Sequence, residues 1–199
     1  ANMEQQVADI GSVMALTGDE MKQVGTLIAD LGLDPKLKVS ATEAGQAIEA
    51  LGKNGLTLTQ IMDGAAKSTV LLANSTGGTF GQAADIATSA MAQFGIAAKD
   101  MDGAINQIVG VTVKSKFTID DYALAIAQAG GVASSVGVSF ADFNTTIAAI
   151  SPLFASGSDA GTSFKTFLQT LIPKSGDAME AMKQLGIVTA DGQNQFFTA

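Results

Sequence analysis

The side chains best suited to chemistry in this sequence are acidic and lie in two close pairs. Asp100 and Asp102 form one pair, and Asp120 and Asp121 form the other. Two neighbouring carboxylates can bind a divalent cation or divide general acid and base roles between them. Each pair, however, falls at the predicted start of a helix, where the helix dipole stabilises negative charge. We therefore interpret both pairs as structural.

Two short motifs with some likeness to ligand-binding loops are incomplete. Gly52-Lys53-Asn54 has the lysine of a phosphate-binding loop but lacks its upstream glycine and its following hydroxyl. Asp191-Gly192 lacks the further carboxylates of a calcium-binding loop. We therefore expect no cofactor and no metal site.

The composition excludes several classes of function. The 199-residue chain contains no cysteine and no histidine, and its eleven basic residues are all lysine. Without cysteine there is neither a disulfide scaffold nor a thiolate metal site, and without histidine the commonest general base is missing. Bidentate readout of phosphate or guanine needs arginine, and the net charge of −8 disfavours a nucleic-acid-binding surface. We expect a protein that is not an enzyme and has no specific nucleic-acid partner.

The polar residues instead follow one local pattern at the predicted helix starts. A hydroxyl residue with an acid or glutamine three residues later can form a capping box, and flanking apolar residues can staple the chain entry. The predicted structural caps are Thr17 with Glu20, Ser40 with Glu43, Thr57 with Gln60, Thr118 with Asp121, and Ser139 with Asp142. Because aspartate is shorter than glutamate, we expect its two copies to act more through the helix dipole than through a full box. Thr79 with Gln82 is a weaker copy, because Gly78 stands where the apolar residue should be.

The spacing of apolar residues predicts short helices joined by tight turns. We predict helices over residues 3–15, 19–31, 41–53, 58–74, 80–93, 98–113, 119 to about 129, 140–150 and 160–172, and a tenth after Ser175 that ends at Gly186. One more helical turn over residues 131–137 stays open. Residues 187–197 have the pattern of a short β-hairpin around Asp191-Gly192. The expected fold class is all-α: a compact array of about nine to ten short capped helices with Gly/Ser/Thr turns, plus that hairpin.

The predicted elements suggest three parts of the chain. We expect an N-terminal helical hairpin and linker in residues 1–38, a helical core domain in residues 39–186, and a hairpin or a linker to a continuation in residues 187–199. The caps at Ser40 and Thr57 are separated by one predicted helix, and so are those at Thr118 and Ser139. Both pairs have the form of a helix–turn–helix unit, but their side-chain identity is too low to predict a solenoid.

One uncharged stretch, residues 122–141, raises the question of a membrane contact. Spanning a bilayer needs about 20 predominantly apolar residues. This stretch contains Gln128, a Gly130-Gly131 pair and several serines, so its hydrophobicity is poor for lipid. We favour a buried helix followed by a turn, with a membrane-active segment as the alternative.

Residues 39–57 resemble the core domain of the phage tail tape measure protein family, whose hallmark has the form "ysatEaa.aLe.La.aGlt". Residues 15–18, 85–95, 158–168 and 187–192 resemble further segments of that family in the same order, so the resemblance covers nearly the whole chain. Each motif is low in information, and their order and spacing carry the likeness. Lys165 stands where the family more often has arginine.

The resemblance implies a structural protein of the virion of a long-tailed phage or of a related injection device. Members are long, mostly helical chains that set tail length during assembly and are ejected with or ahead of the genome. The implied location is the tail lumen or tail tip, after synthesis in the host cytoplasm. The implied partners are tail tube proteins, tail-tip or baseplate hub proteins and tail assembly chaperones. Separately, small-residue surfaces such as Gly130-Gly131 and Ala148-Ala149 lead us to expect self-association.

Two other functions stay open at this point. The chain could be a helical adaptor that binds tail-tip or baseplate proteins, or a membrane-active segment that aids DNA delivery. A peptidoglycan hydrolase is disfavoured, because histidine and cysteine are absent and the acid pairs all lie at helix starts.

Overall fold

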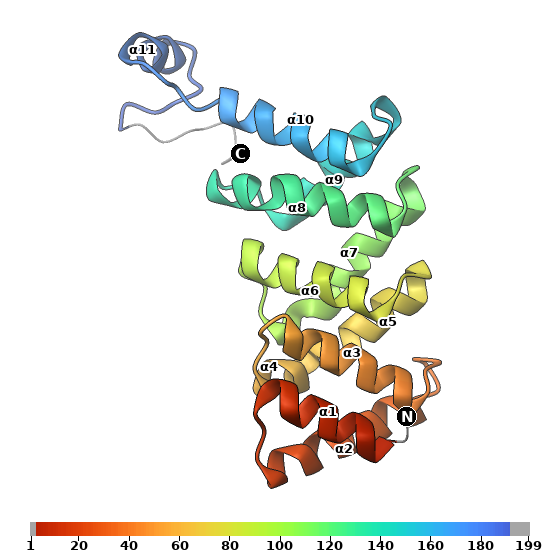
Figure 1. Cartoon of the computed structure of the whole chain (residues 1–199). Helices are drawn as coiled ribbons and strands as arrows, with labels where there is room; N and C mark the ends of the chain where they lie inside the picture. Colours follow the sequence, from red (N-terminus) through yellow and green to blue (C-terminus); the bar gives the residue numbers. More distant parts are fainter. Residues whose placement is uncertain (1–2, 192–199) are drawn as a thin grey trace.

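The computed structural model describes residues 3–191, and its helices form a column of two layers (Figure 1). The front layer consists of α1 (Met3–Met14), α3 (Ala41–Lys53), α6 (Phe80–Phe94), α8 (Ile119–Ser135) and α10 (Gly157–Thr170). The back layer consists of α2 (Gly18–Leu33), α5 (Ala66–Thr76), α7 (Met101–Lys114) and α9 (Phe140–Ile150). The last helix, α11 (Gly176–Gln184), lies away from the column (Figure 1). The predicted all-α class is confirmed.

The chain alternates between the two layers. Along the front layer α1 packs on α3, α3 on α6, α6 on α8 and α8 on α10, and along the back layer α5 packs on α7 and α7 on α9. Each front helix and the back helix that follows it therefore form a hairpin, and the hairpins stack along one axis. Such a stack is a helical solenoid, in which each repeat contacts mainly its neighbours.

The front helices begin at a nearly constant spacing. Four of their N-caps are Ser40, Thr79, Thr118 and Ser156. Their period of about 39 residues lies within the range typical of solenoid repeats. Two buried positions recur with the same period: one holds Gln6, Ala44, Ala83, Tyr122 and Ala160, and the other holds Ile10, Ile48, Ala87, Ile126 and Phe164. The chain is therefore a repeat protein, which the sequence interpretation missed, because the caps of consecutive helices are one helix apart, whereas the repeat is a hairpin of two helices.

Small residues allow the front helices to approach one another, and the closest approach is between α8 and α10. A Cβ added at Gly157 would lie 1.8 Å from the carbonyl oxygen of Asp121, and one at Gly161 would lie 2.8 Å from that of Ala125. Only glycine fits at such a backbone-to-backbone approach. One contiguous apolar core runs from α1 to α10.

The predicted helix over residues 58–74 is interrupted at its centre. In its place the chain forms three consecutive elements: α4 (Leu58–Gln60), a π-helical turn η1 (Ile61–Ala65) and α5. Gly64 has a φ of 132°, which L side chains rarely adopt, and a Cβ there would lie 3.0 Å from the carbonyl oxygen of Ala98. The kink brings η1 against the short 3₁₀ turn η2 (Ala98–Asp100).

Other helix boundaries also differ from the prediction. α8 continues to Ser135 and not only to about residue 129, because the Gly130-Gly131 pair stays helical while Gly130 packs against the Gln93 side chain. α10 begins at Gly157 where a loop was expected, because Ser156 caps it. A second 3₁₀ turn, η3 (Ser151–Leu153), precedes it. Most of the predicted hairpin around Asp191-Gly192 lies outside the described residues, and the three-part division of the chain stays a prediction.

Candidate functional site

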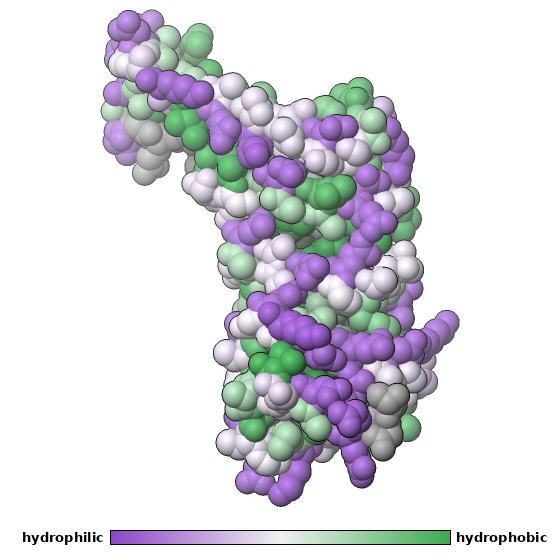
Figure 2. All heavy atoms as spheres, in the orientation of Figure 1, coloured by the Kyte–Doolittle hydropathy of each residue, from purple (hydrophilic) through white to green (hydrophobic). Residues whose placement is uncertain are grey.

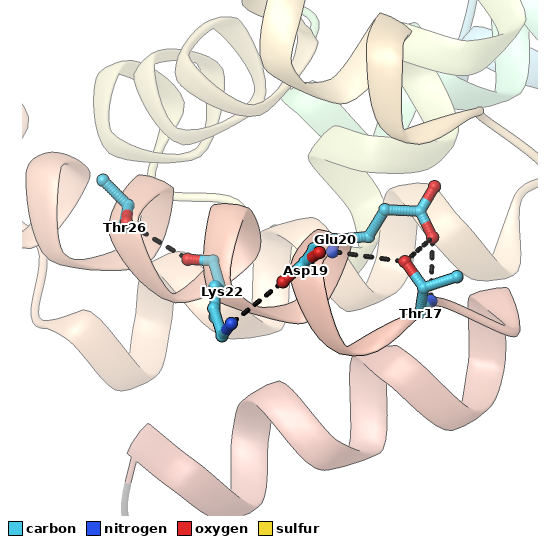
Figure 3. Close-up of polar contacts among 5 residues, drawn as sticks. All are labelled: Thr17, Asp19, Glu20, Lys22 and Thr26. Carbon is cyan, nitrogen blue, oxygen red and sulfur yellow. Dashed lines mark hydrogen bonds and ion pairs between the residues drawn. The ribbon is translucent and has the colours of Figure 1, made fainter.

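The predicted cap residues lie at the helix starts, and four of the five pairs form a reciprocal box. Figure 3 shows one of them, in which the Glu20 carboxylate accepts from the Thr17 amide at 2.8 Å. The Thr17 hydroxyl in turn accepts from the Glu20 amide at 3.4 Å. The same two bonds join Ser40 with Glu43 in α3, and Thr57 with Gln60 in α4. These side chains satisfy amides that the first helical turn leaves unpaired.

The two aspartate copies differ from each other. The Asp121 carboxylate accepts from the Thr118 amide at 3.1 Å, and the Thr118 hydroxyl accepts from the Asp121 amide at 3.3 Å, so the box is complete. For this pair the expectation of a mainly dipolar role is wrong. The Asp142 carboxylate instead accepts from the Ser139 hydroxyl at 2.6 Å, and the pair lacks the bond to the Ser139 amide that would complete a box.

One cap, Ser156, escaped the sequence interpretation; its hydroxyl accepts from the Asp159 amide at 3.2 Å. At the predicted start of the tenth helix, the Ser175 hydroxyl accepts from the Ala178 amide at 3.1 Å. Ser156 follows Thr118 by one repeat and has an acid three residues after it. The repeat period was the signal that would have found it.

Hydrogen bonding lowers the pKa of the box carboxylates. The Thr17 amide and hydroxyl hold the pKa of Glu20 below its ordinary value, and those of Ser40 do the same for Glu43. Burial raises the pKa of Asp121, but hydrogen bonds from Gly157 and Thr118 outweigh it, and the net shift is downward. These acids are thereby kept ionised as acceptors, which does not suit them to proton transfer near neutral pH.

A ladder of polar contacts joins successive front helices, and a carboxylate accepts a hydrogen bond at each step. The Gln6 amide donates to Glu49 at 3.1 Å, the Asn54 amide to Asp85 at 2.8 Å, the Gln82 amide to Asp120, and the Gly157 backbone to Asp121 at 2.9 Å. The Asp120–Asp121 pair thus reaches toward two different neighbours, α6 and α10, and does not converge on one point. In the other pair, Asp102 accepts from the Ser68 hydroxyl at 2.6 Å.

The front surface also carries a shallow groove between α3 and α6. It has a volume of about 650 Å³, and its charged lining residues are Glu49, Lys53 and Asp85. The Lys53 Nζ atom lies 2.7 Å from the Glu49 carboxylate oxygen Oε1, so these two side chains form an ion pair. Figure 2 shows a hydrophilic band across this half of the column. Within residues 3–191, no three acidic side chains gather closely enough to hold a metal ion. The groove can offer hydrogen bonds and charge to a partner surface.

One polar chain is buried between three helices. The Tyr122 hydroxyl in α8 donates to Asn144 in α9 at 2.6 Å, and the Asn144 amide contacts Gln107 in α7 at 3.4 Å. Burial raises the pKa of Tyr122 far above its ordinary value, so the phenol stays protonated as a donor. This network fixes the register of α9 on α8 and is structural.

Comparison with known proteins places the chain among components of phage tails. The family model described as phage-related minor tail protein matches residues 18–199. The chain is also 25% identical, over 184 residues, to the tape measure protein of Pneumococcus phage Dp-1. Those residues are 92% of this chain and 16% of that relative, so the chain spans about a sixth of the length of the curated relative it matches. No solved structure matches it.

Proposed function

This chain belongs to the family of phage-related minor tail proteins, and we propose that it is a segment of a tape measure protein that sets tail length during assembly. As a member of that family it has a structural role in the virion tail and acts together with other tail components.

The stacked repeat is the observation that carries the proposal. In a solenoid each repeat contacts only its neighbours, so adding a repeat lengthens the column without disturbing the rest. Length is then proportional to the number of repeats, which is the property a ruler needs. A compact globular fold offers no such proportionality.

The packing between repeats also suits a chain that has to leave the tail. Alanine recurs in the contacts of the front layer, at Ala44, Ala83, Ala87 and Ala160 among others. Because stabilisation scales with the apolar area buried, each such alanine contact contributes little to holding neighbouring repeats together. We propose that the repeats open in turn when the chain is ejected with or ahead of the genome.

We further propose a position in the tail lumen or tail tip, with tube proteins, tip or baseplate hub proteins and assembly chaperones as partners, and no catalytic activity. The acids of the front layer support a non-catalytic role, because they are engaged in caps and in the ladder. The groove between α3 and α6 favours the adaptor alternative as a second role. The membrane alternative has less support: α8 buries Tyr122, Ile126 and Ala133, and no helix within residues 3–191 is long and apolar enough to cross a bilayer.

Deleting or duplicating one repeat in the full-length protein of a phage that carries this chain tests the proposal. Residues 79–117 form one such repeat, with α6, η2 and α7. Tail lengths measured by electron microscopy are expected to shorten or lengthen by one increment. The increment is about 60 Å if the helices lie end to end in the tail, and about 10 Å if the folded column is retained along the tail axis.

A replacement control keeps the number of repeats constant. Exchanging residues 79–117 for a second copy of residues 118–155 is expected to leave tail length unchanged. Unchanged length after the deletion would contradict the ruler. Loss of tip attachment on the exchange, with no change of length on the deletion, would favour the adaptor.

A further inference from the structure

Asn54-Gly55 is the single asparagine–glycine pair in the sequence. In such a pair the backbone nitrogen of the glycine can attack the carboxamide carbon of the asparagine, because glycine has no side chain to obstruct the approach and its backbone turns freely. The attack closes a five-membered imide and releases ammonia. Asparagine is accordingly one of the residue types that are chemically labile at high temperature. The pair is therefore a candidate modification site in a chain without cysteine or histidine.

The folded chain holds the attacking nitrogen away from the carboxamide carbon. Ring closure requires the Gly55 nitrogen to eclipse the Asn54 Cβ atom, viewed along the Asn54 Cα–C bond. Asn54 has a ψ of 2°, so the Gly55 nitrogen instead eclipses the backbone nitrogen of Asn54. The Gly55 amide also donates to the Gly52 carbonyl at 3.0 Å. The attack therefore requires the turn at the end of α3 to open.

The nitrogen that would leave is held by the neighbouring repeat. The Asn54 Nδ2 atom donates to Asp85 Oδ1 at 2.8 Å and to the Thr88 hydroxyl at 3.2 Å, and both acceptors belong to α6. The two bonds fix the orientation of the carboxamide as long as α3 and α6 stay packed side by side (Figure 1). Protection of Asn54 thus depends on the stacking of one front helix on the next.

Water has access to this position in the folded chain. Asn54 is exposed, and it lines both the groove between α3 and α6 and a second groove that runs on toward the end of α6. The protection therefore comes from backbone geometry and hydrogen bonding, and exclusion of water has no part in it.

We propose that Asn54 is a deamidation site that the stacked column protects and that reacts when the joint between α3 and α6 opens. The Gly55 nitrogen loses its proton and bonds to Asn54 Cγ, the Cγ–Nδ2 bond breaks, and ammonia leaves. Water then opens the imide at Cγ to give aspartate, or at the backbone carbonyl carbon to give isoaspartate, and returns a proton to the Gly55 nitrogen. The net change is hydrolysis of a carboxamide to a carboxylate. This site does not depend on the ruler function.

The product cannot remake the native joint. A carboxylate at position 54 has no hydrogen to donate to Asp85, and two neighbouring carboxylates disfavour each other's ionised form. The new charge also lies at the C-terminal end of α3, where the helix dipole disfavours negative charge. Isoaspartate further adds a methylene group to the backbone next to Gly55, which turns there with a φ of 88°. Opening is thereby made irreversible, because the open chain is chemically changed before it closes.

Mass spectrometry of peptides measures the reaction as the mass increase from exchange of NH₂ for OH. In guanidinium chloride the 199-residue chain is expected to deamidate faster at Asn54 than at Asn106, which precedes glutamine. In native buffer the rate at Asn54 is expected to be lower by about tenfold or more, since tenfold corresponds to about 1.4 kcal/mol of opening free energy. Equal rates at Asn54 in the two conditions would overturn the protection. An unmodified Asn54 in guanidinium chloride would overturn the site.

Asp85→Ala tests whether α6 supplies the protection. Loss of the carboxylate is expected to raise the native rate at Asn54 by about fivefold or more, the effect of losing about 1 kcal/mol of hydrogen bonding. The rate in guanidinium chloride is expected to stay the same. Asp30→Ala removes an exposed acid on α2 and is the matched control, with no change expected in either condition. An unchanged native rate in Asp85→Ala would contradict the proposal.

Asn54→Asp reproduces the aspartate product and tests its effect on the joint. The substitution is expected to lower the urea concentration of half-unfolding more in the parent chain than in an Asp85→Asn chain, where the exchanged pair again joins a donor with an acceptor. The helix-dipole effect is the same in both chains, so the difference reports the contact between positions 54 and 85. Circular dichroism shows that each variant is folded. Equal lowering in the two chains would refute the claim that the product weakens the joint.

Discussion

The amide of Gly157 donates a hydrogen bond to the Asp121 carboxylate at 2.9 Å, across 36 residues of sequence. The same carboxylate closes the capping box of Thr118. One side chain therefore serves both the start of α8 and the contact between α8 and α10. The geometry requires glycine at position 157, because a Cβ there would lie 1.8 Å from the Asp121 carbonyl oxygen.

Gly157→Ala is expected to destabilise the chain by about 2 kcal/mol or more, because the obstacle is backbone and α10 must move away from α8. Urea unfolding followed by circular dichroism measures the change. Gly103→Ala is the matched control, since a Cβ in that exposed part of α7 meets nothing within 4 Å. The control is expected to be neutral or stabilising by about 0.5–1 kcal/mol. Equal effects of the two substitutions would contradict the close approach.

Gly64→Ala is expected to cost about 1–3 kcal/mol, because alanine at a φ of 132° is strained and its Cβ approaches the Ala98 carbonyl. Thermal unfolding is the measurement. Gly81→Ala, in open space at the start of α6, serves as the control. Unchanged stability in Gly64→Ala would mean that the chain at η1 readily adopts a regular helix.

Stability is expected to fall in acid. The pKa values of Glu20, Glu43 and Asp121 are lowered by folding, so the unfolded chain binds more protons than the folded chain at low pH. Their contribution is complete above the unfolded-state pKa of about 4 and is lost as pH falls through the folded values.

Urea unfolding between pH 2 and pH 7, about the range in which carboxylates titrate, checks this sign. A Glu20→Gln, Glu43→Gln, Asp121→Asn variant keeps the acceptor oxygens but does not titrate at these sites, so its stability is expected to depend less on pH. An equally steep loss of stability in that variant would show that other acids dominate.

Tyr122→Phe is expected to cost about 1–3 kcal/mol, because the buried Asn144 oxygen loses its 2.6 Å donor. Thermal unfolding is again the measurement. Phe80→Leu, at a half-buried position with no hydroxyl, provides the comparison for loss of packing alone. Full stability of Tyr122→Phe would mean that water replaces the phenol as the donor.

Local chemistry made the helix starts predictable. A box such as that of Ser40 and Glu43 is made by atoms three residues apart, so its pattern is complete within a short stretch of sequence. Local reasoning was not sufficient for Thr118 and Asp121. The short aspartate side chain predicted a weak box, but Asp121 also accepts a hydrogen bond from Gly157, which lies in a helix 36 residues away in the sequence.

The sequence by itself determined an all-α fold, most of the helix starts and the absence of histidine, cysteine and arginine chemistry, because these follow from residue types and spacing. Only the tertiary structure decided that α1, α3, α6, α8 and α10 stack as successive repeats with a nearly constant period. It also decided that Gly157 and Gly64 must be glycine, and that Asp120 and Asp121 reach toward different helices. The physical reason is that these features depend on contacts between residues far apart in the sequence, and the repeated positions share burial but neither identity nor size.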